Sequence, residues 1–279
     1  MRKSALIFCL TVFSLLLTSV HSYAKAREKV KHVFMVIFEN EDYSSVINLP
    51  FFKKLAGEGV NFTKYTAITH PSQPNYIALI AGDTLGFITD LSRTVDARHL
   101  GNLLEEGERS WKIYVEDWPG NCFLGDFSGE YVRRHNPFIS FTNVQQNPNM
   151  CNHIVNATQL WKDLRKNRLP EFSMYIPNLR NDGHDTGAKF ADTWYGKTFG
   201  PQLKNKNFTD GLLLVTTFDE GGYFENNIIY TSFWGPTVKQ GTVATPYNHY
   251  DLLRTVEDIY DLDTLGLNDS TSDGMDGWR

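Results

Sequence analysis

Acidic and amide side chains follow two apolar runs of the sequence at the point where each run ends. Glu39 and Asn40 follow residues 33–38, and Asp219 and Glu220 follow residues 212–218. In an open parallel sheet, ligands bind beyond the carboxyl ends of the strands, so these side chains are expected to converge on one divalent cation. Oxygen ligands suit hard divalent cations better than a thiolate or all-histidine set would. The alternative is that each cluster is only a solvated strand end.

Ser72 is the candidate nucleophile. It lies in the segment His70-Pro-Ser-Gln-Pro-Asn75, where Pro74 favours the first turn of a helix. Backbone N–H groups and the helix dipole at such a start would stabilise both a bound phosphate and a serine alkoxide. A metal bound to the serine oxygen would activate it further. Ser72 could instead be an ordinary N-cap residue.

Three histidines stand in polar contexts suited to acid–base work. His184, with its neighbour Asp185, follows the apolar run 172–176, and His249 opens the last long helical pattern. A histidine beside acidic groups at a strand end can hold a phosphate oxygen or protonate a leaving group. His135 is a weaker candidate of the same kind. The alternatives are a polar turn around His184 and a capping or surface role for His249.

Strand and helix patterns alternate along the chain and predict the elements that position these residues. Continuous apolar runs, typical of strands buried on both faces, occur at residues 33–38, 111–115, 172–176, 212–218 and 228–234. Helical patterns occur at residues 50–57, 74–81, 97–107, 157–167 and 250–260. This alternation predicts the α/β class, with a central, largely parallel sheet flanked by helices on both faces. We expect residues 25–279 to form a single domain.

Length, composition and charge narrow the class of protein. The 279 residues are enough for one large α/β domain. The hydrophobic fraction of 41% and the charged fraction of 21% are ordinary for a folded protein. The net charge of -5 gives no electrostatic reason for a nucleic-acid partner, because binding to phosphate backbones needs a clustered basic surface. The basic cluster at residues 25–31 is interpreted as the solvated start of the mature chain.

The first residues have the pattern of a secretory signal peptide. Basic residues at positions 2–3 precede an apolar run over residues 5–17, and a cleavage site fits at residues 22–24. We therefore expect residues 1–24 to be removed and the mature protein to be secreted. The apolar run is short for a membrane span and no later segment is long enough, so no stable membrane anchor is expected.

Export would place the remaining cysteines in an oxidising compartment. Cys122 and Cys151 stay in the mature chain, and two such thiols most often pair, so a disulfide between them is predicted. Two separate buried thiols are the alternative. The Gly-, Asn- and Pro-rich segment 120–152 would then be a long ordered segment between strands, held in place by the disulfide. Four Asn-x-Ser/Thr sequons, at Asn61, Asn156, Asn207 and Asn268, fit a glycosylated surface if the source is eukaryotic.

With these pieces in order, the chain resembles the phosphoesterase family that joins acid phosphatases with bacterial phospholipases C, within the alkaline-phosphatase-like superfamily. The resemblance spans residues 33–260. Its most specific elements are Phe38-Glu-Asn40, Ser72-Gln-Pro-Asn75, Asn181-Asp-Gly-His-Asp185, Phe218-Asp-Glu-Gly-Gly222 and Asn248-His-Tyr-Asp-Leu-Leu-Arg-Thr-Val-Glu257. Five such elements in the expected order make the resemblance specific.

The resemblance implies a role for each candidate residue. In the family, one divalent cation is held at positions that match Glu39, Asn40, Ser72, Asp219 and Glu220 of this chain. The sequence does not name the metal. Ser72 also matches the nucleophile, and its Ser-x-Pro-Asn spacing is similar to the Thr-x-Pro-Asn of nucleotide pyrophosphatases, in which threonine attacks. Asn75 and His135 are assigned to substrate binding. His184, Asp185 and His249 fall where two-metal relatives place a second metal, a space that this family is thought to fill with polar side chains.

The resulting hypothesis is a secreted, metal-dependent acid phosphatase that hydrolyses small phosphate monoesters through a phosphoserine intermediate. The chain is shorter than the bacterial members of the family and looks more like their compact secreted relatives, which favours monoesters. Three alternatives stay open. The first is a phospholipase C or other phosphodiesterase that uses the same site. The second is a serine esterase, although the Gly-x-Ser-x-Gly elbow of such enzymes is missing around Ser72. The third is a secreted binding protein on an inactive scaffold.

Overall fold

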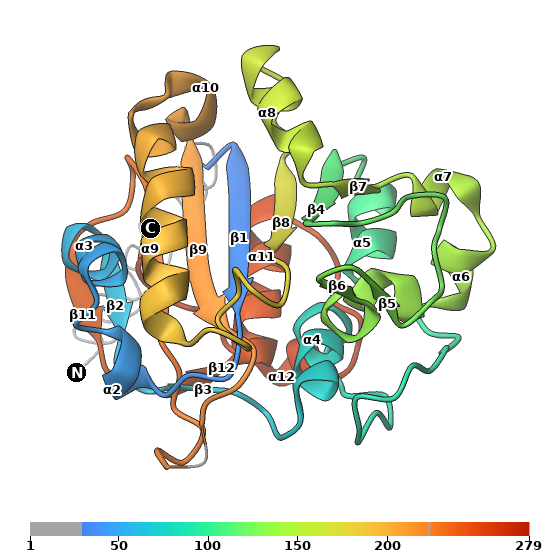
Figure 1. Cartoon of the computed structure of the whole chain (residues 1–279), viewed down its shortest axis with the longest axis horizontal. Coiled ribbons are helices and arrows are strands. Elements are labelled where there is room, and N and C mark those ends of the chain that lie inside the picture. Colours follow the sequence, from blue (N-terminus) through green and yellow to red (C-terminus); the bar gives the residue numbers. More distant parts are fainter. Residues whose placement is uncertain (1–29, 223, 279) are drawn as a thin grey trace, which may run out of the picture.

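An eight-stranded sheet lies at the centre of the computed structural model, which describes residues 30–222 and 224–278 (Figure 1). Its strand order is β11-β2-β10-β9-β1-β8-β4-β7. The strands are β1 (His32–Phe38), β2 (Val60–Phe62), β4 (Trp111–Val115), β7 (Ile154–Asn156), β8 (Phe172–Ile176), β9 (Leu212–Phe218), β10 (Thr231–Trp234) and β11 (Gly241–Val243). Every residue of β8 and β9 is buried, as expected for apolar runs covered on both faces.

The strands from β9 to β7 run parallel, which confirms the predicted largely parallel sheet. β1 lies between β9 and β8, with Phe38 opposite Phe218 on one side and Val36 opposite Tyr175 on the other. Because these three strands run in the same direction, their carboxyl ends meet at one edge of the sheet. This edge is where the sequence places the candidate site.

The fifth predicted strand, residues 228–234, is a strand only from Thr231 onward. The residues before it make isolated antiparallel bridges instead. β10 is also antiparallel to both of its neighbours, β9 and β2. The reason is the connection: the described residues of 219–230, which are all but position 223, contain no helix, and a parallel crossover needs a dozen or more residues that usually include one.

Helices flank the sheet, with α9 on one face and α11 on the other (Figure 1). The longer helices are α3 (Pro50–Glu58), α4 (Ser72–Ala81), α5 (Leu100–Glu106), α8 (Thr158–Arg165), α9 (Ala188–Phe199) and α11 (His249–Tyr260). Five of them overlap the predicted helices. α9 was not predicted, although its buried residues Ala188, Ala191, Tyr195 and Phe199 recur at the spacing of one helix face.

Shorter elements connect the larger ones. They are the helices α2 (Tyr43–Val46), α6 (Thr142–Gln145), α7 (Pro148–Cys151), α10 (Lys206–Thr209) and α12 (Asn268–Thr271), the 3₁₀ helices η1 (Arg133–His135), η2 (Pro137–Ser140) and η3 (Gly200–Lys204), and the strands β3 (Tyr65–Thr66), β5 (Phe127–Ser128), β6 (Tyr131–Val132) and β12 (Tyr247–Asn248). β3 and β12 pair in parallel, and α11 packs against α4. The start of α11 is therefore held beside the segment that leads into α4.

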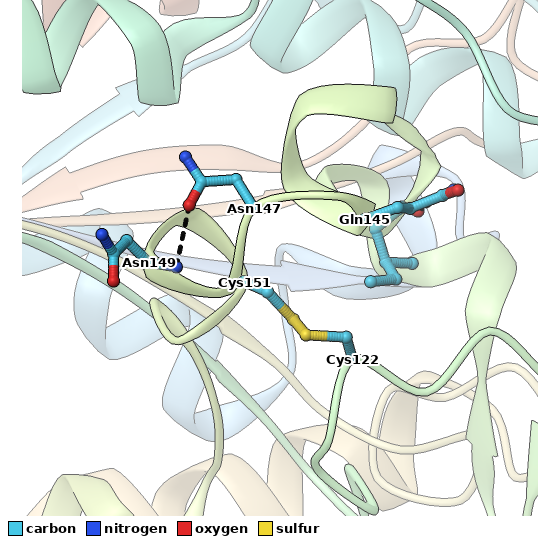
Figure 2. The surroundings of a disulfide bond; sticks show 6 residues. Cys122, Gln145, Asn147, Asn149 and Cys151 are labelled. Atoms are coloured by element: carbon cyan, nitrogen blue, oxygen red, sulfur yellow. Dashed lines mark hydrogen bonds between the residues drawn. A yellow bond between two sulfur atoms is a disulfide. The ribbon is translucent and has the colours of Figure 1, made fainter.

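The predicted disulfide joins Cys122 to Cys151, with Cα atoms 5.9 Å apart (Figure 2). The two cysteines are 29 positions apart in the sequence, and the segment between them contains β5, β6, η1, η2, α6 and α7. Asn147 caps α7 by accepting a hydrogen bond of 3.0 Å from the backbone N–H of Asn149. The long ordered segment expected from the sequence is thus present, and the disulfide joins its two ends.

The predicted leader, residues 1–24, lies outside the described residues. Of the basic cluster at residues 25–31, Lys31 is described, and its ammonium group lies 2.7 Å from Asp210 Oδ2 on the surface. In the part of the chain that the structure describes, no helix combines the length and the apolar character that a membrane crossing requires.

Replacing Cys122 and Cys151 together by serine should destabilise the protein, because the disulfide restricts the unfolded chain over the 29 positions that it closes. Loop-closure entropy for this length is worth about 3–4 kcal/mol in free energy of unfolding. Urea denaturation with and without reductant would measure the effect. Reductant should destabilise the wild-type protein by a similar amount and leave the double variant unchanged. Equal stability of the oxidised wild type and the variant would contradict the prediction.

Candidate active site

The carboxyl ends of β1 and β9 bring the predicted oxygen ligands together. The two strands end at paired phenylalanines, and the residues that follow are Glu39 and Asn40 on one strand and Asp219 and Glu220 on the other. The backbone N–H of Asn40 donates a hydrogen bond of 3.2 Å to Asp219 Oδ1. Asn40 has a φ of 50°, in the left-handed region that asparagine tolerates better than most residues. This turn directs both strand ends toward one point.

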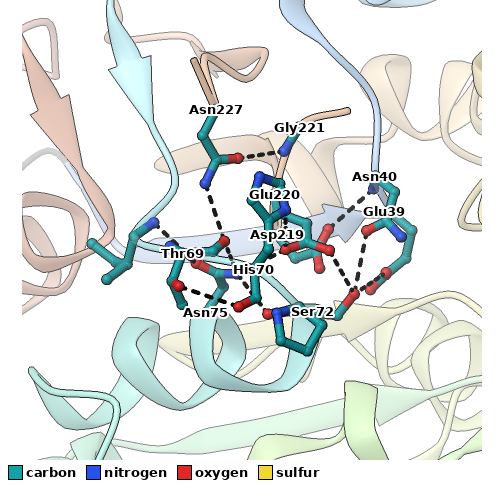
Figure 3. Close-up of polar contacts among 12 residues, drawn as sticks. Glu39, Asn40, Thr69, His70, Ser72, Asn75, Asp219, Glu220, Gly221 and Asn227 are labelled. Atoms are coloured by element: carbon teal, nitrogen blue, oxygen red, sulfur yellow. Dashed lines mark hydrogen bonds and ion pairs between the residues drawn. The ribbon is translucent and has the colours of Figure 1, made fainter. Parts of the chain in front are cut away.

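Ser72 is the first residue of α4, and its hydroxyl faces this point (Figure 3). The Ser72 Oγ atom lies 3.0 Å from Glu39 Oε2, 3.2 Å from Asn40 Oδ1 and 3.4 Å from Glu220 Oε1. Pro71 takes the N-cap position, so Ser72 is not the ordinary N-cap of the alternative interpretation. One hydroxyl proton can serve only one of three acceptors. Turning the Asn40 amide lets its nitrogen donate to Glu39 Oε2, Glu220 Oε1 and Ser72 Oγ at 3.2 Å each, whereas a cation in the pocket would favour the orientation with Asn40 Oδ1 inward.

Asn75, expected at the substrate, is fully buried and holds the chain before α4 in place. Its Oδ1 atom accepts hydrogen bonds from the backbone N–H groups of Ile68 and Thr69, at 2.9 and 3.0 Å. Its Nδ2 atom donates to the carbonyl oxygen of Thr69 at 2.9 Å and to Glu220 Oε2 at 3.3 Å. The contacts of Asn75 thus connect the start of the helix to the carboxylate cluster.

Burial raises the pKa of each carboxyl group in the cluster. For Glu39, burial is the largest cause of a pKa well above the usual range, and the charges of Asp219 and Asp182 raise it further. Burial also raises the pKa of Glu220, and the charge of Asp219 adds to the effect. Within residues 30–222 and 224–278, the ion-pair partners of the cluster are two histidines, and no lysine or arginine pairs with it. Protons or a cation are needed to offset this negative charge.

The donor set fits a hard divalent cation. The side-chain atoms that surround the Ser72 hydroxyl are carboxylate and amide oxygens, which such ions prefer. Asp219 Oδ2 is buried and has no hydrogen-bond partner in the described part of the chain, although buried polar atoms are nearly always paired. Glu39, His135 and Asp182 also form a buried group whose ligand atoms lie within 4.8 Å of one another.

His135 lies between two carboxylates rather than at an open substrate surface. Its Nε2 atom is 3.3 Å from Glu39 Oε1, and its Nδ1 atom is 3.3 Å from Asp182 Oδ2. The ring stacks on Tyr76 with centroids 5.4 Å apart, and the Tyr76 hydroxyl donates to Glu39 Oε1. Burial lowers the pKa of His135 well below its usual value, and Arg134 adds to this. Both ring nitrogens and Asp182 Oδ2 are buried and make no hydrogen bond in the described residues, and burial raises the pKa of both carboxyl groups.

His184 and Asp185 form a partly exposed pair at the rim of the site. His184 Nδ1 lies 2.7 Å from Asp185 Oδ1, with 32% of the His184 side chain and 53% of the Asp185 side chain exposed. The backbone N–H of His184 donates to Asp182 Oδ1 at 2.8 Å, and its ring centroid is 6.1 Å from that of His135. The pair is thus joined to the buried cluster on one side and open to solvent on the other.

His249 is buried behind the end of β9. Its Nε2 atom lies 2.7 Å from the carbonyl oxygen of Asp219, and its Nδ1 atom lies 3.0 Å from the Tyr65 hydroxyl. Burial lowers the pKa of His249 to about 4, so the neutral ring donates through Nε2 and accepts through Nδ1. Both ring nitrogens are engaged, and their contacts fix the backbone at Asp219.

Four residues near the site were missed as functional candidates by the sequence analysis. They are His70, Tyr76, Asp90 and Asp182. His70 Nδ1 lies 2.8 Å from Glu220 Oε2 and stands two positions before Ser72. Tyr76 lies four positions after Ser72, which places it on the same face of α4. These spacings were available signals, whereas nothing in the sequence around Asp90 indicates its contact with α4.

Comparisons with known proteins agree on the family. The Phosphoesterase family model matches residues 18–263. A probable acid phosphatase of Kluyveromyces lactis is 34% identical over 260 residues, covering 88% of this chain and 62% of that protein. A phosphatidylinositol-3-phosphatase of Mycobacterium tuberculosis is 33% identical over 261 residues, covering 91% of this chain and 85% of that protein. The chain spans 55–62% of the length of four acid phosphatases that it matches.

Solved structures agree on the fold. A protein in the alkaline phosphatase superfamily from Vibrio parahaemolyticus matches with a TM-score of 0.62 and 13% identity, over 86% of this chain and 70% of that chain. A phosphonate monoester hydrolase from Silicibacter pomeroyi matches with a TM-score of 0.59 and 11% identity, over 88% and 76% of the two chains. At such identities the likeness concerns the fold alone, and it confirms the expected alkaline-phosphatase-like architecture.

The raised carboxyl pKa values predict how stability depends on pH in metal-free protein. Because the folded-state pKa values of Glu39, Asp219 and Glu220 lie above those of the unfolded chain, the folded state binds more protons. Their contribution to the free energy of unfolding is therefore largest below about pH 4 and falls as pH rises through the folded-state values. Each unit of pKa difference corresponds to about 1.4 kcal/mol. Urea denaturation of chelator-treated protein between about pH 5 and pH 8 measures this decline.

Asp219→Asn provides the matched control, because it removes one of the titrating groups at nearly constant shape. The stability of this variant should fall less steeply with pH than that of the wild type. A saturating divalent cation should flatten the wild-type curve, since positive charge then takes the place of the protons. A free energy of unfolding that rises with pH in the metal-free wild type would contradict the assignment.

Proposed function

The chain belongs to the Phosphoesterase family, and from this premise we propose that it is a phosphoric ester hydrolase that removes phosphate from small monoesters. One observation carries the proposal: the hydroxyl of Ser72, at the first position of α4, lies within 3.4 Å of oxygen atoms from Glu39, Asn40 and Glu220. The fungal relatives are acid phosphatases, which favours monoesters as the substrates of this chain.

One divalent cation is part of the proposal. Glu39, Asn40, Ser72, Asp219 and Glu220 would hold it, and when bound it would supply positive charge to the phosphoryl oxygens and to the serine oxygen. The support is the all-oxygen donor set and the unpartnered Asp219 Oδ2 atom. The α4 dipole and its first N–H groups face the same place and favour an anion there.

The chemical steps follow from the positions of this chain's own residues. Ser72 Oγ attacks phosphorus, and its proton passes to an oxygen of the surrounding carboxylates, of which Glu39 Oε2 is nearest, at 3.0 Å. The bond between Ser72 Oγ and phosphorus forms while the bond from phosphorus to the ester oxygen breaks, and the alcohol leaves with one added proton. Water then cleaves the phosphoserine and releases inorganic phosphate. Most of the barrier reduction in such a transfer comes from positioning and electrostatic stabilisation.

His184 is the proposed donor of the proton that the leaving alcohol takes up. Its ring is partly exposed and carries Asp185 on Nδ1, which orients the ring and leaves Nε2 as a donor. His249 is less suited to this step, because it is buried and contacts Asp219 and Tyr65 through its two nitrogens. We therefore assign His249 and Asn75 to positioning, while His135 and Asp185 orient Glu39 and His184.

Secretion and glycosylation remain part of the proposed biology. The Cys122–Cys151 disulfide supports an oxidising compartment. Among the sequon residues, Asn207 and Asn268 are exposed, whereas Asn61 and Asn156 are half-buried. Exposure therefore favours Asn207 and Asn268 as glycan acceptors if the chain is made in a eukaryotic cell.

Replacing Ser72 by alanine should abolish turnover of an aryl phosphate in the presence of a divalent cation. Removal of the attacking group predicts a fall in kcat of roughly 10³-fold or more, with unfolding curves close to those of the wild type. The matched control is Ser45→Ala, at an exposed position of α2, which should retain full activity.

Three outcomes would argue against the proposed function. Undiminished activity of Ser72→Ala would remove Ser72 from the mechanism. Activity toward a bis-aryl phosphate or phosphatidylcholine alone would favour the phosphodiesterase alternative. A wild-type protein that stays inactive after chelation and add-back of single divalent cations would favour the non-catalytic scaffold.

His184→Asn should affect substrates according to how much their leaving groups need a proton. For an alkyl phosphate, we expect kcat to fall by about 10²–10⁴-fold. A nitrophenyl phosphate has a stable leaving group, so its kcat should fall by less than about tenfold. Steady-state kinetics on both substrates measure the contrast. His249→Gln is the control and should affect both substrates alike, and an equal loss on both substrates in His184→Asn would rule out a proton donor at His184.

A further inference from the structure

The segment over residues 86–94, called here the Asp90 loop, contacts the nucleophile helix at its first turn. Asp90 Oδ1 accepts a hydrogen bond of 2.9 Å from the backbone N–H of Gln73, the residue directly after Ser72. The first N–H groups of a helix have no partner within the helix and attract anions. A side-chain carboxylate therefore occupies an anion-binding donor next to the proposed nucleophile.

Gln73 also holds the loop on both sides of Asp90. With its amide nitrogen facing the available acceptors, the Gln73 side chain donates to the carbonyl oxygen of Thr89 at 3.2 Å and to that of Leu91 at 2.9 Å. The Gln73 side chain is buried. Arg93 closes the loop by donating to the carbonyl oxygen of Gly86 at 2.6 Å. The contact between Asp90 and α4 is thus part of an ordered arrangement.

The charge of Asp90 reaches the candidate ligands. Burial is the largest cause of the raised pKa of Glu220, followed by the charge of Asp219 and then that of Asp90. Burial lowers the pKa of His135, and the charge of Asp90 acts in the opposite direction. Asp90 itself is an exposed residue.

A second observation at the same place indicates a ligand. Asp219 Oδ2 is buried and lacks a hydrogen-bond partner in the described part of the chain. The site therefore combines a backbone donor at the start of α4 that already binds a carboxylate with a buried oxygen after β9 that has no partner in the described residues. Together they fit a cation and the anion that accompanies it.

We propose that the Asp90 carboxylate occupies, in the free protein, the position of a phosphoryl oxygen, and that a phosphate group must displace it to bind. The proposal rests on the proposed function, because it takes the start of α4 as the phosphoryl site. A carboxylate and a phosphate compete for one N–H group and repel each other. Asp90 thus weakens the binding of substrate and of inorganic phosphate alike, and it favours release of the product.

The test compares Asp90→Asn and Asp90→Ala with the wild type in the full chain. The asparagine variant keeps an acceptor for the Gln73 N–H but removes the charge, and the alanine variant removes both. The matched control is Asp96→Asn, which removes the same charge at an exposed position further along the chain. Thermal unfolding curves establish that each variant folds, and the near-isosteric asparagine variant keeps the test valid if the alanine variant does not fold.

Titration calorimetry with inorganic phosphate, in saturating Mg²⁺ or Mn²⁺, measures the affinity without any turnover. Both Asp90 variants should bind phosphate about three- to tenfold more tightly than the wild type, and Asp96→Asn should match the wild type. In kinetics on an aryl phosphate, KM should fall by a similar factor with kcat unchanged or lower through slower release of phosphate.

Unchanged or weaker phosphate binding in the Asp90 variants would overturn the inference. A second result would also overturn the inference. If kcat of Asp90→Asn falls and its pH profile loses one limb, Asp90 transfers a proton. Failure of the proposed function is a different result, since the wild type itself would show neither turnover nor cation-dependent phosphate binding.

Discussion

Repulsion among buried carboxylates at the ends of β1 and β9 is the interaction on which the site depends. Glu39, Asp219 and Glu220 are each 4% exposed or less and share the space around one serine hydroxyl. Two unit charges about 4 Å apart repel by about 4 kcal/mol at the effective dielectric constant of about 20 that is typical of proteins. The fold must therefore hold these groups together against their own charge.

The strands and the backbone, more than the ligands themselves, hold the groups in place. Parallel pairing of β1 with β9 sets the two ligand-bearing turns side by side. His249 fixes the backbone at Asp219 from behind, and Asn75 ties the entry of α4 to Glu220. Asn227 adds a further tie, because its amide accepts from the Gly221 N–H and donates to the carbonyl oxygen of Thr69. Such outer contacts orient the groups that bind a metal and are part of its site.

The sequence predicted the parts of the site that depend on strand ends. Buried parallel strands produce continuous apolar runs, and polar residues directly after them must lie at one edge, so Glu39 and Asp219 could be placed together without a structure. Contacts made through loops could not be placed in this way. Asp90 meets Gln73 because residues 86–94 fold back on α4, and no periodic pattern encodes that path. The direction of β10 could not be predicted from the sequence either, because it depends on the connection after β9 and not on the apolar run itself.

The two carboxylate oxygens of Glu39 make different contacts. These contacts decide how the buried group of Glu39, His135 and Asp182 is interpreted. Its Oε2 atom faces Ser72, whereas its Oε1 atom accepts from the Tyr76 hydroxyl and faces His135. A second cation between His135 and Asp182 would compete with the Tyr76 proton for Oε1 and would sit where the side chains are at most 1% exposed. The contacts of His135 with Glu39 and Asp182 are ion-pair distances of 3.3 Å without hydrogen bonds in the described part of the chain, whereas the Tyr76 hydroxyl donates directly to Glu39. We therefore interpret this group as the support that orients Glu39, with the cation and the phosphoryl group on the Ser72 side.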